Sequence, residues 1–171
     1  MMAMLAAGSV LTMTNALAAA GTVNFNGNIL DSACDVDVAS QNQVVVLGDY
    51  YKTEFPTTGA RTAATQFNII LKNCPVTVTN AKVRFDGTPD LTNASLLAID
   101  TSVAGAATGV AINLMTADKA DLPLHGSNSY TYALSSTADN TLSFYAQYIS
   151  TAASVTAGPA NSVANFSVVY N

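Results

Sequence analysis

The side chains that could perform acid–base or nucleophilic chemistry are few and scattered along this chain. His125 is the only histidine, and it lies in a polar stretch at 124–128. A catalytic serine needs a histidine base that is itself oriented by a carboxylate, and no motif places such partners beside His125. This pattern is typical of a histidine in a surface loop, and we expect the protein not to be an enzyme.

Metal binding is also poorly supported by the residue types. Asp31, Asp35 and Asp37 flank Cys34, but calcium loops usually gather their oxygen ligands around a glycine turn, which is missing here. Solvated positions along a strand edge explain these acidic residues better. We expect no metal and no cofactor.

Cys34 and Cys74 are the only cysteines of the chain. In an exported protein an even pair indicates a disulfide, so the sequence predicts a Cys34–Cys74 bond. The alternatives are two free thiols or half of a metal site, and the metal site would need more ligands than one histidine supplies.

The N-terminal residues have the pattern of an export signal. Residues 1–17 are uncharged and largely apolar, and Ala16, Leu17 and Ala18 form a small-x-small cleavage site. We predict a signal peptide over 1–18, although no basic residue precedes the apolar run, which indicates a start that lacks a few residues. The alternative is a buried alanine-rich helix. No later run is long enough to span a membrane, so the mature chain is expected to be soluble.

Composition argues for one exported β-rich domain. The chain has six Lys plus Arg against eleven Asp plus Glu, a net charge of −5, and no tryptophan. Without a basic cluster, nucleic-acid binding has no electrostatic support. The abundance of Thr, Ser, Asn, Ala and Val favours strands over a helical bundle.

Apolar residues alternate with polar ones in short segments separated by turns, which is the pattern of a sandwich or barrel. We expect strands around 32–38, 66–72, 76–85, 110–114, 130–134, 142–148 and 164–171, with a short apolar run at 44–47 and a long connection over 50–65. No amphipathic helix is expected after residue 20.

The two ends of the mature chain share one feature, an apolar face on a terminal strand. Near the start, Val23, Phe25, Gly27 and Ile29 occupy one face of a predicted strand. In the final segment, Ala164, Phe166, Val168 and Tyr170 alternate with polar or exposed positions. Two such strands suggest a protein that joins end to end with copies of itself.

Several motifs, taken in order, resemble those of chaperone–usher fimbrial pilins of the type 1 major-subunit kind. Residues 21–27 read GTVNFNG and precede Cys34, and 66–74 read QFNIILKNC; later segments are GVAINL at 109–114, FYAQY at 144–148 and ANFSVVYN at 164–171. Each motif is weak alone, but together they span the whole mature chain.

The resemblance implies an all-β, incomplete immunoglobulin-like β-sandwich of six strands that lacks its seventh. It divides the chain into a signal peptide (1–18), an N-terminal donor-strand extension (19–30) and a pilin domain (31–171). The donor face would consist of Val23, Phe25, Gly27 and Ile29. The strand bordering the acceptor groove, to which a chaperone binds first, would present Ala164, Phe166, Val168 and Tyr170. Gly27 would fit a shallow part of the groove, or it could be an ordinary turn glycine.

The function implied by the resemblance is that of a structural fimbrial subunit supporting cell adhesion. Such subunits pass through the periplasm to the cell surface with a periplasmic chaperone and an outer-membrane usher. They then polymerise head to tail with copies of themselves and related pilins by donor-strand exchange. The alternative is a carbohydrate-binding adhesin or lectin-like domain, and an assembled fimbria could also bind a host receptor. The absence of tryptophan removes a favoured sugar-stacking residue.

Overall fold

The computed structural model describes residues 22–27, 29, 33–126 and 130–170. The chain divides into two units, Met1–Leu30 and Asp31–Asn171. The predicted signal peptide, residues 1–18, lies outside the described residues. In the first unit, residues 22–27 and 29 belong to no helix or strand.

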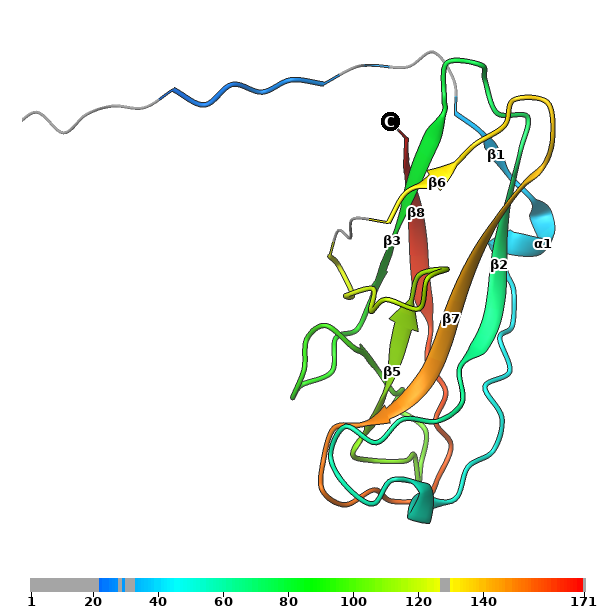
Figure 1. The fold of residues 1–171 in the computed structure, drawn as a ribbon. Coiled ribbons are helices and arrows are strands. Elements are labelled where there is room, and N and C mark those ends of the chain that lie inside the picture. Colours follow the sequence, from blue (N-terminus) through cyan, green and yellow to red (C-terminus); the bar gives the residue numbers. More distant parts are fainter. Residues whose placement is uncertain (1–21, 28, 30–32, 127–129, 171) are drawn as a thin grey trace, which may run out of the picture. The chain divides into compact units, whose positions relative to one another are not determined.

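The second unit consists of two antiparallel sheets (Figure 1). The five-stranded sheet has the order β1-β2-β7-β5-β4 and the three-stranded sheet the order β6-β3-β8. In chain order the strands are β1 (Asp35–Val36), β2 (Thr65–Lys72), β3 (Asn80–Gly87), β4 (Leu97–Ala98), β5 (Val110–Met115), β6 (Tyr132–Ala133), β7 (Asn140–Ser150) and β8 (Ala164–Tyr170). One helical turn, α1 (Val38–Gln41), and a 3-10 turn, η1 (Lys52–Glu54), interrupt the first connections. No helix among the described residues has the length and apolar character needed to cross a membrane.

Aromatic side chains join the two sheets at the centre of the core. The ring of Phe85 on β3 lies 5.3 Å from that of Phe144 on β7 and 6.0 Å from that of Phe67 on β2. Ile69 and Leu71 are fully buried on the same face of β2. Because alternate side chains of each strand point to the same side, the period-two segments of the sequence supply this shared core. The predicted immunoglobulin-like sandwich is confirmed.

The predicted disulfide is also confirmed. Cys34 and Cys74 are bonded to each other, and both are buried. The bond ties the segment before β1 to the residues just after β2, where Asp35 already pairs with Lys72.

Several local expectations were wrong: β3 begins at Asn80 rather than near residue 76, and β6 spans only Tyr132–Ala133. The strand expected over 32–38 is only Asp35–Val36, because Asp37 accepts a hydrogen bond from the backbone N–H of Ala39 at 3.0 Å and begins α1. Strand β5 does not alternate between buried and exposed residues: all six are buried. Its outer side is covered because Ala111 packs in a separate small cluster with Leu96 and Ile149.

The acidic residues and the histidine singled out in the sequence form local pairs. Asp37 lies 2.7 Å from the ammonium of Lys72, and Asp35 accepts from the amide of Asn73 at 2.9 Å. His125 Nδ1 lies 2.8 Å from a carboxylate oxygen of Asp86. Asp31 lies outside the described residues.

Five aspartate carboxyls have a pKa below their usual 3.8, each mainly because it accepts a hydrogen bond from a neighbouring side chain. They are Asp37 beside Lys72, Asp86 beside His125, Asp100 beside Ser102, Asp118 beside Thr116 and Asp121 beside Arg61. A carboxyl with a lowered folded pKa contributes stability above its unfolded pKa, and that contribution is lost as the pH falls through the folded value.

We therefore expect the melting temperature to be nearly constant between about pH 7 and 5 and to fall below about pH 4. Thermal unfolding followed by circular dichroism at a series of pH values measures this. The Asp121→Asn variant loses the ion pair with Arg61, so its melting temperature should be lower at neutral pH and should decline less in acid. A melting temperature that stayed constant down to about pH 2 would show that these carboxyls contribute no pH-dependent stability.

Candidate functional site

Strand β8 has a partner on one side only. It pairs with β3 along its full length, from Gly87 opposite Ala164 to Ala81 opposite Tyr170. Within the part of the chain that the structure describes, no strand pairs with its other edge. An edge of this length presents a row of backbone N–H and C=O groups and is a ready template for another strand.

The inward face of β8 is incompletely covered. Ala164, Phe166, Val168 and Tyr170 pack against the core but are only half-buried. On the neighbouring strand β3, by contrast, Ala81, Val83 and Phe85 are buried. The sandwich therefore leaves apolar surface accessible directly beside the unpaired edge of β8, at the four residues that the sequence singled out.

A second unpaired edge comes from the segment 43–50. Val44 and Val46 are 88% and 75% exposed, whereas Val45 and Leu47 are half-buried, so the segment alternates like a strand. Its backbone makes no backbone–backbone hydrogen bond to any described residue. The segment thus has the side-chain pattern of a strand but lacks the backbone hydrogen bonds that would join it to a neighbouring strand.

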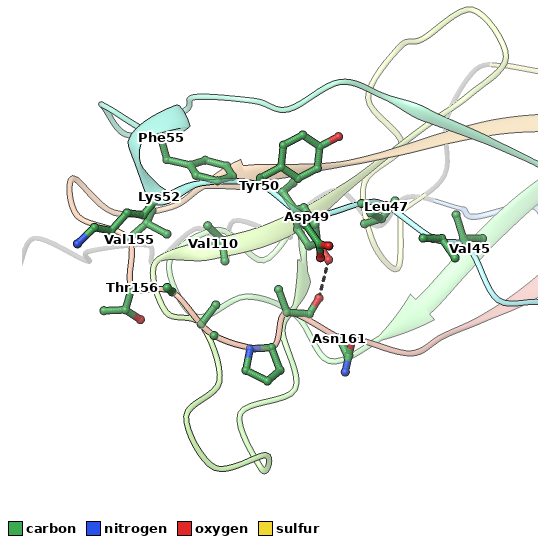
Figure 2. A pocket seen from close by; sticks show the side chains of 18 of the residues that line it. Val45, Leu47, Asp49, Tyr50, Lys52, Phe55, Val110, Val155, Thr156 and Asn161 are labelled. Carbon is green, nitrogen blue, oxygen red and sulfur yellow. Dashed lines mark hydrogen bonds between the residues drawn. The ribbon is translucent and has the colours of Figure 1, made fainter.

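The segment 43–50 and the residues before β8 enclose a cavity of about 460 Å³ (Figure 2). Residues 44–50 line one side and 155–161 the other. Phe55, Val110 and Tyr148 also belong to the lining. The hydroxyl of Tyr148 donates to the carbonyl of Ala160 at 2.9 Å, and burial raises the pKa of this tyrosine. Most of the lining residues are apolar, but polar atoms contribute about as much of the lining surface as apolar ones.

At the other end of β8 the same two parts of the chain meet directly. The hydroxyl of Tyr170 donates to the carbonyl of Cys34 at 3.4 Å, next to the disulfide. Burial raises the pKa of Tyr170, which keeps this hydroxyl protonated. The same two parts of the chain, one before η1 and one near the C-terminus, therefore approach each other at both ends of β8. At one end Tyr170 contacts Cys34, and at the other end the cavity lies between residues 44–50 and 155–161.

The predicted donor residues are not covered by any of the residues that the structure describes. The side chains of Val23, Phe25 and Ile29 are 75%, 92% and 101% exposed. A Cβ at Gly27 would meet no heavy atom within 4 Å, so the described residues give no steric reason for a glycine there. The role of these four residues as an inserting face stays a prediction.

Sequence reasoning found the β8 side of this site and missed the other side. The residues it missed are Val45, Leu47, Tyr50, Phe55, Tyr148 and Val155, which line the cavity. The available signal was the apolar run 44–47, which ends where Gly48 takes a positive φ of 94°. The apolar character of this run is evident from the sequence, but no local pattern places it opposite residues more than a hundred positions later.

Comparison with known proteins gives a consistent result. The profile of the family described as "Fimbrial protein" matches residues 23–171. The chain is 37% identical over 164 residues to the S-fimbrial protein subunit SfaG of Escherichia coli, a match that covers 96% of this chain and 91% of that protein. It is 37% identical over 171 residues to the fimbrial subunit type 1 of Klebsiella pneumoniae, covering 95% and 93%. A solved structure described as a chaperone–usher pilus superposes with a TM-score of 0.68 at 25% identity, covering 95% of this chain and 100% of that one.

Proposed function

The chain belongs to the fimbrial protein family, and from this premise we propose that its unpaired β8 edge receives the N-terminal extension of another copy. The protein is a structural pilin subunit of chaperone–usher fimbriae and a component of the cell surface. The proposal concerns how its copies join. Strand addition supplies backbone hydrogen bonds along the edge, and alternate side chains set the register.

The observation that carries this proposal is that β8 is unpaired along one edge while its apolar face is only half-buried. An incoming strand would pair with β8 on one side and with the segment 43–47 on the other. Its apolar face would then cover Phe166 and Val168. The cavity between residues 44–50 and 155–161 would receive one side chain of the same strand.

The residues 22–29 fit the role of the incoming strand. Val23, Phe25 and Ile29 are exposed and share one face with Gly27. Burying three apolar side chains of this size contributes roughly 5–9 kcal/mol. Each subunit has one such extension and one such edge, so the contact is heterologous and gives an open filament.

Before assembly, the same edge would bind a periplasmic chaperone, and an outer-membrane usher would mediate the exchange of chaperone for donor strand. A subunit with an unprotected edge and exposed apolar surface is prone to unwanted strand pairing, which is the physical reason for a chaperone. Copies of this chain and related pilins are the proposed neighbours in the fimbria. A host receptor would be reached through the assembled fimbria.

A peptide of residues 21–30 tests the proposal directly. Mixed with the purified mature subunit, it should raise the melting temperature and block polymer formation, because it completes the sheet and occupies the edge. A control peptide of the same composition, reordered so that Val, Phe and Ile are divided between the two faces, cannot present one apolar face in any register. The proposal fails if the native peptide produces no more stabilisation than the reordered one.

A further inference from the structure

The N-terminal extension has a second face, opposite the inserting one, and the composition of this outer face is unusual for a strand. Asn24, Asn26 and Asn28 alternate with the apolar residues, and Asn24 and Asn26 are exposed. Asparagine is depleted in strands, where threonine or valine would be better placed. Three asparagines at alternate positions therefore weaken the strand that the proposed function requires, unless their amides find partners once the strand is formed.

The outer face of β8 offers matching groups. Asn165 and Ser167 are exposed on the side opposite Phe166 and Val168. Neither side chain makes a hydrogen bond to any of the residues for which the structure gives a position. An amide and a hydroxyl thus stand side by side along the unpaired edge, each able to donate and to accept.

The neighbouring strand β3 does not use these groups. In the register, Arg84 lies opposite Ser167 and Asp86 opposite Asn165. The guanidinium of Arg84 instead lies 2.9 Å from the carboxylate of Asp86, which His125 also contacts at 2.8 Å. Arg84 and Asp86 therefore have partners other than Asn165 and Ser167, whose side chains remain exposed on the outer face of β8.

We propose that Asn24 and Asn26 of one copy form a ladder of side-chain hydrogen bonds with Asn165 and Ser167 of the next, and that this ladder favours copies of this chain as neighbours. The inference rests on the proposed strand addition. In a paired antiparallel strand, directly opposite side chains on one face lie about 4.5–5.5 Å apart, within reach of amide–amide and amide–hydroxyl bonds. An extension with charged or apolar outer residues could insert its apolar face equally well but would lack the ladder.

A double-mutant cycle isolates this ladder. Two fluorescent peptides of residues 21–30, native and Asn24→Ala/Asn26→Ala, are titrated into the native mature subunit and into its Asn165→Ala/Ser167→Ala variant. The subunit's own extension competes equally with both peptides, so the ratio of their apparent Kd values on one subunit is unaffected by it. Because Asn165 and Ser167 are exposed, the subunit variant should melt at nearly the native temperature, which circular dichroism checks.

On the native subunit, the native peptide should bind about 2- to 30-fold more tightly than the alanine peptide, the range expected for two cross-strand pairs. On the Asn165→Ala/Ser167→Ala subunit, this ratio should fall to about one. An equal ratio on both subunits, with both peptides bound, would overturn the ladder and leave strand addition standing. If neither peptide bound either subunit, both the ladder and the proposed function would be wrong.

Discussion

A subunit carrying Phe25→Asp should be excluded from fimbriae, with incorporation reduced at least about 100-fold. Strand addition would bring residue 25 against the half-buried apolar face of β8, where native Phe25 gains about 2–3 kcal/mol by burial. An aspartate there loses that gain, and its unpaired carboxylate costs several kcal/mol more to desolvate. Because each 1.4 kcal/mol is a factor of ten, the loss exceeds two orders of magnitude.

The measurement is the fraction of variant subunit found in purified fimbriae when native and variant copies are produced together. Phe25 is exposed in the subunit, so the melting temperature of the isolated variant should match the native one. Thr22→Asp is the matched control, since it adds the same charge on the outer face of the extension. Normal incorporation of the Phe25→Asp subunit would show that residue 25 is not on the inserting face.

Removing the disulfide should give the largest loss of stability. The bond between Cys34 and Cys74 closes a loop with a sequence separation of 40, and such a bond stabilises by roughly 3–4 kcal/mol. For a chain of this size, that corresponds to a fall in melting temperature of roughly 6–16 °C. The effect should extend to assembly, because Cys34 precedes the segment 43–50 and its carbonyl accepts from Tyr170.

The Cys34→Ala/Cys74→Ala variant is the appropriate one, since alanine leaves no buried polar group behind. Urea unfolding of the native and variant subunits, each with and without reductant, measures the effect. Reductant should lower the urea concentration at which half of the native protein is unfolded to near the value for the variant. The value for the variant itself should not change. Equal midpoints for the oxidised native and variant proteins would mean that the bond contributes nothing to the folded state.

The sequence predicted those strands that bury one face and expose the other. In β2, β3 and β8, polar and apolar residues alternate because one side of each strand meets the core. Strand β5 departs from that rule: Asn113 is buried because its amide donates to Asp121 at 2.8 Å, a contact that depends on the loop after β5. Periodicity within a strand cannot reveal what a later loop will cover.

The candidate site was predicted only on the side formed by a regular strand. Ala164 to Tyr170 have a period of two over seven residues, and β8 spans those residues. The opposite side is the short apolar run Val44 to Leu47, and its place depends on packing against Tyr148 and the loop 155–161. Contacts between residues so far apart in sequence are set by tertiary structure, which local pattern does not encode.

The single unpaired edge of β8 has a consequence for the two tips of any filament assembled as proposed. However many copies are joined, one terminal copy keeps a bare edge that no neighbour covers, and the opposite terminal copy keeps an unused extension. The tips are therefore chemically unlike, so growth has a direction. A protein that donates a strand and offers no edge of its own would end growth at the tip with the bare edge.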